Sequence, residues 1–349
     1  MRYGLNAFPS GGERRSSERE QILARRISDL GLKVEGTRME KLVQRLHEEL
    51  GAAGIRLRPP VYLSDEWGCP DRLPIIGVPF YLADQELTRI ADEMMEGVEA
   101  ETDDEILRYL RHEAGHAFNY AYKLYETEEW QAVFGPFIQP YLEEYVPRPF
   151  SHNYVRHLSG WYAQKHPDED FAETFAVWLA PGSNWRELYQ GWGCFTKLLY
   201  VDRVVRQFGD SPPLVTAKGY DVTEEALFSS VAEHYRRLRP QPGEIPPVLD
   251  QGLRDVFEPS ARMSTVEGDG AEPAAEFVAR HRRALVRRIS HWSGLNDVAI
   301  RDLLDHIGQR CVQLGLRVRT GPEAALLDLT ALVSTLSMNK LLTGEFVGK

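Results

Sequence analysis

The spacing of apolar and polar residues predicts that most of the chain is helical. Two shorter apolar segments, residues 55–67 and 73–84, have proline at their edges and turns, which is typical of strands. The pattern therefore predicts an α+β fold that is predominantly helical and has a small sheet. The predicted helices span residues 18–50 (as two helices broken near Gly31), 85–98, 167–180, 274–293, 296–315 and 323–343, and a further helix starts at the Thr102 cap and continues through Ala121. Residues 126–160 are expected to be irregular with short helices, and helical spacing continues over residues 185–208.

Composition divides the chain into four parts. Residues 1–17 are polar and rich in Gly, Ser and Arg, which predicts a flexible N-terminal lead-in. Residues 18–237 are expected to form the main domain, since 349 residues exceed what one core usually needs. Residues 238–273 are rich in Pro, Gly and charge, as linkers are. Residues 274–349 are expected to form a helical C-terminal extension.

Charge and cysteine usage exclude several classes of protein. The net charge of −11 argues against a general nucleic-acid binder or a protein of anionic membranes, both of which are normally basic. No run of 18 apolar residues occurs, and the first residues lack a secretory signal, so no membrane association is expected. Cys69, Cys194 and Cys311 form no CxxC pair, which excludes a thiolate zinc finger and favours a reducing cytoplasm.

The segment RHEAGHAFNYAY places His112, Glu113 and His116 within a predicted helix. Thr102 and Glu105 form a T-x-x-E capping box at its start. Histidines four residues apart project from one face of a helix and can bind one metal ion. Glu113 lies about 100° round the helix from His112, where a general base for a water molecule belongs. These residues predict a catalytic zinc site.

A third ligand is needed, since catalytic zinc keeps three protein ligands and one open position. The metzincin pattern fails, because Asn119 and Tyr122 stand where it requires glycine and histidine. Glu169 and Glu173 lie four residues apart on one face of the helix predicted at 167–180. One of them can bind the metal while the other accepts an N–H from a ligating imidazole. The spacing alone leaves open which is which.

The segment YAQKHPDEDFAETFAVWL, taken with RHEAGHAFNYAY, resembles the zinc-binding metallopeptidase family of bacteria, a gluzincin group. It is similar, more distantly, to the catalytic domain of anthrax lethal factor. The resemblance covers roughly residues 55–205 and implies a gluzincin-like zincin fold. It implies Glu169 as the zinc ligand, Glu173 beside a ligating imidazole, and Tyr162 as the hydroxyl that stabilises the oxyanion. The cysteine-rich zinc ribbon that members often carry is missing, since only Cys69 precedes the catalytic helix.

The resulting expectation is a cytoplasmic zinc-dependent peptidase that hydrolyses a peptide or protein. Glu113 is the expected general base, and Zn²⁺ is the expected cofactor. His166 is expected near the site, and Asp170 is expected to cap a helix or form an ion pair. The C-terminal helices are a candidate surface for a partner protein. Two alternatives remain: a zinc-containing protein that binds peptides and cleaves them slowly, and a helical interaction protein in which HEAGH is incidental.

Overall fold

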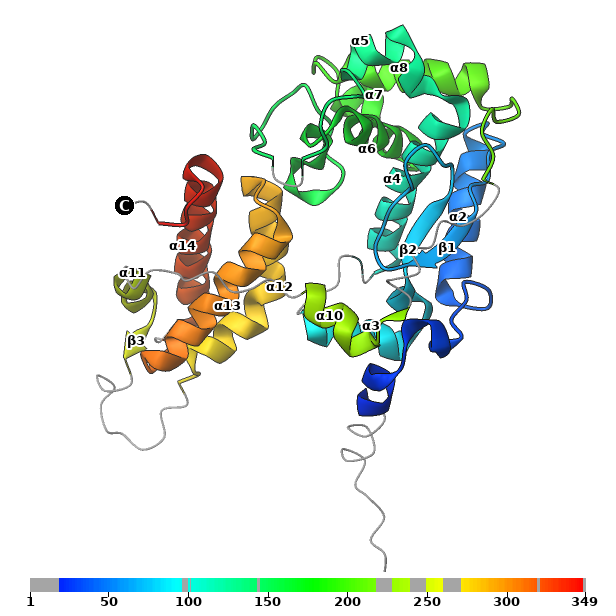
Figure 1. Ribbon diagram of the computed structural model, residues 1–349. Coiled ribbons are helices and arrows are strands. Elements are labelled where there is room, and N and C mark those ends of the chain that lie inside the picture. The colour runs from blue at the N-terminus through cyan, green and yellow to red at the C-terminus, as the bar shows by residue number, and fades with distance from the viewer. Residues whose placement is uncertain are drawn as a thin grey trace, which may run out of the picture. The chain divides into compact units, whose positions relative to one another are not determined.

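The computed structural model of the chain confirms that the protein is predominantly helical with very little sheet (Figure 1). The predicted lead-in, residues 1–17, lies outside the described residues. The chain divides into two compact units, Met1–Lys123 with Phe208–Arg239 and Leu124–Gln207 with Pro240–Lys349. This division passes through the predicted domain 18–237, whose boundaries stay a prediction. The structure describes residues 19–95, 100, 102–142, 145–217, 228–238, 249–259, 271–318 and 321–347.

The first unit contains the only parallel strand pair of the described residues. Val61 of β1 lies opposite Ile76 of β2. Helix α4 packs against helix α2 and strand β2 (Figure 1). The second predicted strand, 73–84, is shorter than expected, because residues 80–83 form a 3₁₀ turn. The elements are η1 Ile27–Leu30, α2 Arg38–Ala52, β1 Val61–Ser64, β2 Ile76–Pro79, η2 Phe80–Ala83, α3 Gln85–Met95, α4 Asp103–Tyr122 and α10 Val231–Leu238.

Two local features fix the helices of this unit. Gly31 adopts a left-handed φ of 67° and ends η1, which confirms the predicted break in residues 18–50. Arg111 of α4 makes a bidentate ion pair with Glu49 of α2, with N–O distances of 2.7 and 2.8 Å. Both side chains are about nine-tenths buried. Because paired guanidinium and carboxylate groups are directional, this contact fixes the rotation of α4 one residue before His112.

The second unit holds the remaining helices. The predicted C-terminal helices are confirmed: α12 spans the predicted residues, and α13 and α14 differ from prediction by no more than two residues at each end. One helix, α11, was not predicted, because it lies within the Pro- and Gly-rich segment 238–273. The elements are η3 Leu124–Glu126, α5 Glu128–Phe134, η4 Ser159–Gln164, α6 Pro167–Leu179, α7 Trp185–Leu188, α8 Phe195–Phe208, α11 Leu249–Val256, β3 Glu258–Pro259, α12 Ala274–Ser293, α13 Asp297–Gln313, β4 Leu316–Arg317 and α14 Pro322–Thr343.

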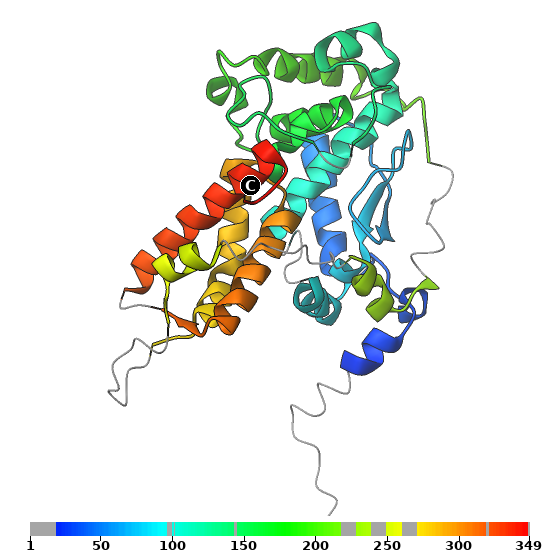
Figure 2. The same ribbon diagram turned by 60° about the vertical axis from the view of Figure 1, so that its left-hand side comes forward.

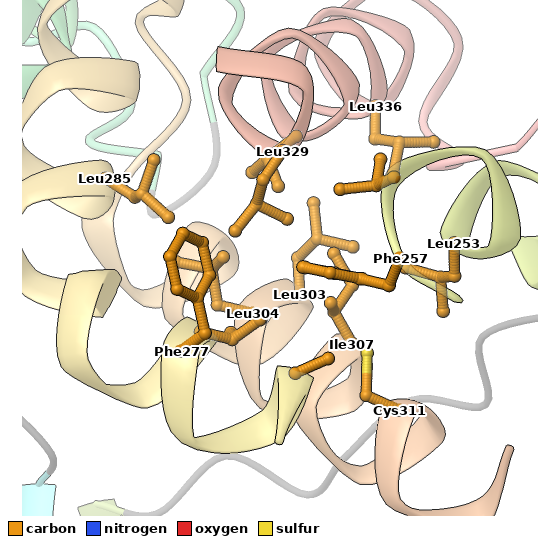
Figure 3. Packing of buried hydrophobic residues seen from close by; sticks show 14 of the residues in the cluster. Leu253, Phe257, Phe277, Leu285, Leu303, Leu304, Ile307, Cys311, Leu329 and Leu336 are labelled. Carbon is orange, nitrogen blue, oxygen red and sulfur yellow. The ribbon is translucent and has the colours of Figure 1, made fainter. Parts of the chain in front are cut away.

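Helices α11 to α14 form a bundle with a hydrophobic core of its own. In both views α12 and α13 run side by side, and α14 packs against both (Figures 1 and 2). Large apolar side chains from all four helices meet between them, and the thiol of Cys311 lies among them (Figure 3). Burial raises the pKa of Cys311 to about 12 and that of Cys194, in a separate core cluster, to about 11. The labelled core residues are Leu253, Phe257, Phe277, Leu285, Leu303, Leu304, Ile307, Cys311, Leu329 and Leu336.

Within the part of the chain that the structure describes, α14 alone is long and apolar enough to cross a membrane by length and composition. A third of its most apolar window is buried. Leu329 and Leu336 fill the bundle core, whereas Leu327 and Leu342 are exposed. Because core helices of bundles share this length and composition, the helix is weak evidence for a membrane span.

Candidate metal centre

Helix α4 presents the histidines of the HEAGH segment in a buried environment. The predicted capping box is confirmed: the Thr102 hydroxyl accepts the Glu105 N–H at 3.2 Å, and the Glu105 carboxylate accepts the Thr102 N–H at 3.1 Å. His112, Glu113 and His116 are each more than nine-tenths buried. Polar side chains of this kind are rarely placed in a protein interior without partners or a ligand. Their burial argues against the alternative that His112 and His116 are ordinary surface residues of an amphipathic helix.

The geometry of the two imidazoles fits a shared metal ion. The Nε2 atoms of His112 and His116 lie 3.1 Å apart. The rings meet edge to face, with centroids 4.8 Å apart. A tetrahedral zinc ion with Zn–N bonds of about 2.0–2.1 Å holds two nitrogens about 3.3 Å apart. The two side chains therefore already point the same nitrogen toward one place.

Glu169 joins these histidines, as the predicted ligand set requires. One ligand atom each from His112, His116 and Glu169 lies within 4.8 Å of the others, and all three residues are buried. Two imidazole nitrogens and one carboxylate oxygen are a donor set typical of catalytic zinc. The Tyr141 hydroxyl donates a hydrogen bond of 2.6 Å to Oε1 of Glu169. This hydrogen bond fixes the orientation of the Glu169 carboxylate.

Glu173 lies one turn further along α6 and has a different environment. Its side chain is fully buried, and Oε2 accepts the backbone N–H of Leu158 at 2.9 Å. Leu158 directly precedes η4, the short helix that carries Tyr162. Glu173 therefore connects α6 to the segment that holds the predicted oxyanion donor.

Tyr162 lies in a small cluster of phenols. Its hydroxyl oxygen is 3.2 Å from that of Tyr141. The ammonium group of Lys165 lies 4.4 Å from the Tyr141 ring centroid and 5.3 Å from that of Tyr162. A cation near two phenol rings favours the build-up of negative charge close by. No sequence motif indicates Tyr141, because it lies in a loop 28 residues before Glu169.

His166 lies at the start of α6, the N-terminal helix position that was expected for it. It is the N-cap of α6, where Nδ1 accepts the Asp168 N–H at 3.1 Å. Its Nε2 lies 3.0 Å from the carbonyl oxygen of Gln139. Since both ring nitrogens have partners, His166 starts the helix and holds the loop that leads to Tyr141.

Asp170 forms a buried ion pair, one of the two roles expected for it. Its Oδ2 lies 2.5 Å from Nζ of Lys197 on α8, and the side chains are 2% and 12% exposed. Burial raises the pKa of Asp170 to about 7, and the Lys197 charge opposes that rise. Nζ also donates to the Asn153 carbonyl at 2.9 Å. The pair thus joins α6, α8 and the loop before η4.

We expect Lys197→Met to destabilise the protein by about 3 kcal/mol, because it leaves a buried carboxylate without its partner. Arg203→Met on the same helix is the matched control. Arg203 pairs with Glu129 at an exposed position, where an ion pair contributes about 0–1 kcal/mol. Chemical denaturation of both variants measures the difference. Equal losses would show that the Lys197–Asp170 pair contributes no more than a surface contact.

Comparison with known proteins adds no relative. No protein-family model matches the chain, and no curated protein or solved structure matches it. The resemblance to zinc metallopeptidases therefore depends on the two motifs and stays a prediction.

Proposed function

We propose that this protein is a zinc-dependent peptidase. The observation that carries the proposal is the buried group of His112, His116 and Glu169, whose ligand atoms lie within 4.8 Å of one another. Glu113, also buried, directly follows the first histidine. Two imidazoles and a carboxylate are rarely buried together in a protein unless they bind a metal ion.

The proposed roles follow from the chemistry of the side chains. His112, His116 and Glu169 would hold the zinc ion. Zinc, when bound, polarises the substrate carbonyl and lowers the pKa of a water molecule toward about 7. Glu113 accepts a proton from the attacking water and delivers it to the leaving amine. The Tyr162 hydroxyl donates a hydrogen bond to the carbonyl oxygen as negative charge develops there.

The proposed substrate is a peptide or protein in the cytoplasm. Cys69, Cys194 and Cys311 all lie in described residues and none forms a disulfide, which is usual in a reducing compartment. We retain the gluzincin-like fold as part of the proposal, because two of the proposed ligands, His112 and His116, come from one motif and the third, Glu169, comes from a second motif further along the chain.

The test combines metal analysis with a cleavage assay. The purified full chain is expected to contain about one zinc ion per chain. It is also expected to cleave members of a pooled, internally quenched fluorescent peptide library. Removal of zinc with 1,10-phenanthroline should abolish cleavage, and one equivalent of Zn²⁺ should restore it.

Two results would contradict the proposal. A chain that contains no stoichiometric metal and binds no added Zn²⁺ has no such centre. A zinc-loaded chain that binds library peptides but cleaves none is a peptide-binding protein instead.

A further inference from the structure

The segment before Tyr162 has an unusual backbone. Gly160 and Trp161 both adopt left-handed conformations, with φ of 76° and 58°. Glycine adopts this conformation readily, but tryptophan rarely does, because its Cβ atom crowds the backbone there. Such a conformation persists only where the surroundings hold it. The conformation of Trp161 also sets the direction in which the next residue, Tyr162, leaves the chain.

The Trp161 indole is held from several sides. It is 5% exposed, and the Arg156 guanidinium carbon lies 4.2 Å from its ring centroid. Phe150 meets it edge to face, with centroids 5.5 Å apart. Among the described residues its Nε1–H has no hydrogen-bond partner, so packing holds the ring in place. On one side the Trp161 indole packs against Gly294.

Gly294 ends α12, the first long helix of the C-terminal bundle. It too is left-handed, with φ of 82°, and its N–H closes the helix onto Ser290. A Cβ atom at this position would overlap Cδ1 of Trp161 and lie 2.9 Å from Nε1 and 3.0 Å from Cγ of Pro147. The indole therefore occupies the space that only a glycine leaves open. The bundle supplies this surface.

We propose that the C-terminal bundle positions Tyr162 through the contact between Gly294 and the Trp161 indole. Trp161 and Gly294 are positioning residues, and a change in the end of α12 alters the placement of the Tyr162 hydroxyl. The expected effect of this contact on turnover rests on the proposed function. The structural coupling itself does not depend on peptidase activity.

Gly294→Ala tests the contact, and Gly344→Ala is its matched control. Gly344 ends α14 with φ of 81°, so both variants introduce the same backbone strain at the end of a bundle helix. A Cβ atom at Gly344 meets nothing within 4 Å. Both variants should therefore lose a similar amount of stability from the left-handed backbone, and only Gly294→Ala should push on Trp161.

The first readout requires no activity. With 3-fluorotyrosine in place of Tyr162, the ¹⁹F resonance is expected to move by more than its linewidth in Gly294→Ala and to stay in place in Gly344→Ala. An unmoved resonance in Gly294→Ala would overturn the proposal. If that variant fails to fold, Trp161→Phe replaces it, because the smaller ring loses the same contact and should move the resonance too.

The second readout is turnover of the quenched peptide library. Gly294→Ala is expected to lower kcat by tenfold to a hundredfold, about the loss caused by a small misplacement of a catalytic group. Zinc content and KM should be unchanged, since the ligands are untouched and Tyr162 acts on the transition state. In a Trp161→Phe background the loss should shrink. An equal loss in Gly344→Ala, or the same loss in both backgrounds, would overturn the proposal.

The two proposals can fail separately. If the wild-type chain cleaves no peptide, the proposed function fails, yet the fluorine resonance still decides whether the bundle moves Tyr162. If the wild-type chain is active and the resonance does not move, the peptidase stands and the coupling is rejected.

Discussion

Glu113→Gln is expected to lower kcat for peptide hydrolysis by a factor on the order of 10³, because an amide cannot accept the proton of the attacking water. The exchange keeps the size and shape of a side chain that is 5% exposed, so the packing of α4 should survive. The zinc content should stay at the wild-type value, since Glu113 is not a proposed ligand. Turnover of the quenched peptide library and metal analysis of the same preparation measure both quantities.

Asp104→Asn provides the control for this exchange. It removes one carboxylate from the exposed first turn of the same helix and should change kcat by no more than about twofold. Unchanged turnover in Glu113→Gln would reject Glu113 as the base. Loss of zinc together with turnover would show that Glu113 holds the metal instead.

The second large effect concerns zinc affinity. Glu169→Gln is expected to weaken zinc binding more than about 100-fold, because zinc sites in proteins use carboxylate oxygen, imidazole nitrogen or thiolate ligands and not a neutral amide. Glu173→Gln should weaken it less than about tenfold, since its amide oxygen can still accept the Leu158 N–H. Competition with a chromophoric chelator measures both affinities.

This pair of variants separates the two glutamates that spacing alone could not distinguish. They lie on the same helix face, one turn apart, and the exchange removes the same charge from each. The reverse order of affinities would make Glu173 the ligand and would remove the basis for the resemblance to gluzincins. Equal, small losses would mean that neither carboxylate binds the ion.

The sequence predicts α4 well because its signals are local. Thr102 and Glu105 define its start, and its apolar residues recur at helical spacing and are buried. The same holds for α12, α13 and α14, whose ends differ little from the predicted ones. Local patterns also sufficed to name His112 and His116, because a spacing of four residues within one helix already fixes their relative position.

Other features escaped prediction because they depend on contacts between distant residues. Tyr141 lies in an irregular loop, and only the folded chain brings its hydroxyl to Glu169. Helix α11 lies in a segment whose composition is typical of a linker, and its buried face, which includes Leu253, forms part of the bundle core. The 3₁₀ turn after β2 has the same apolar composition as a strand, and composition alone cannot separate the two.

The unequal burial of the cysteines has a practical consequence. Cys194 and Cys311 are fully buried and resist ionisation, whereas Cys69 is partly exposed. Because the thiolate is the form that reacts, a maleimide dye near neutral pH should attach at Cys69 alone. The unaltered chain thus offers a single attachment point for a fluorophore, and ligand binding can be followed by fluorescence without first removing native thiols.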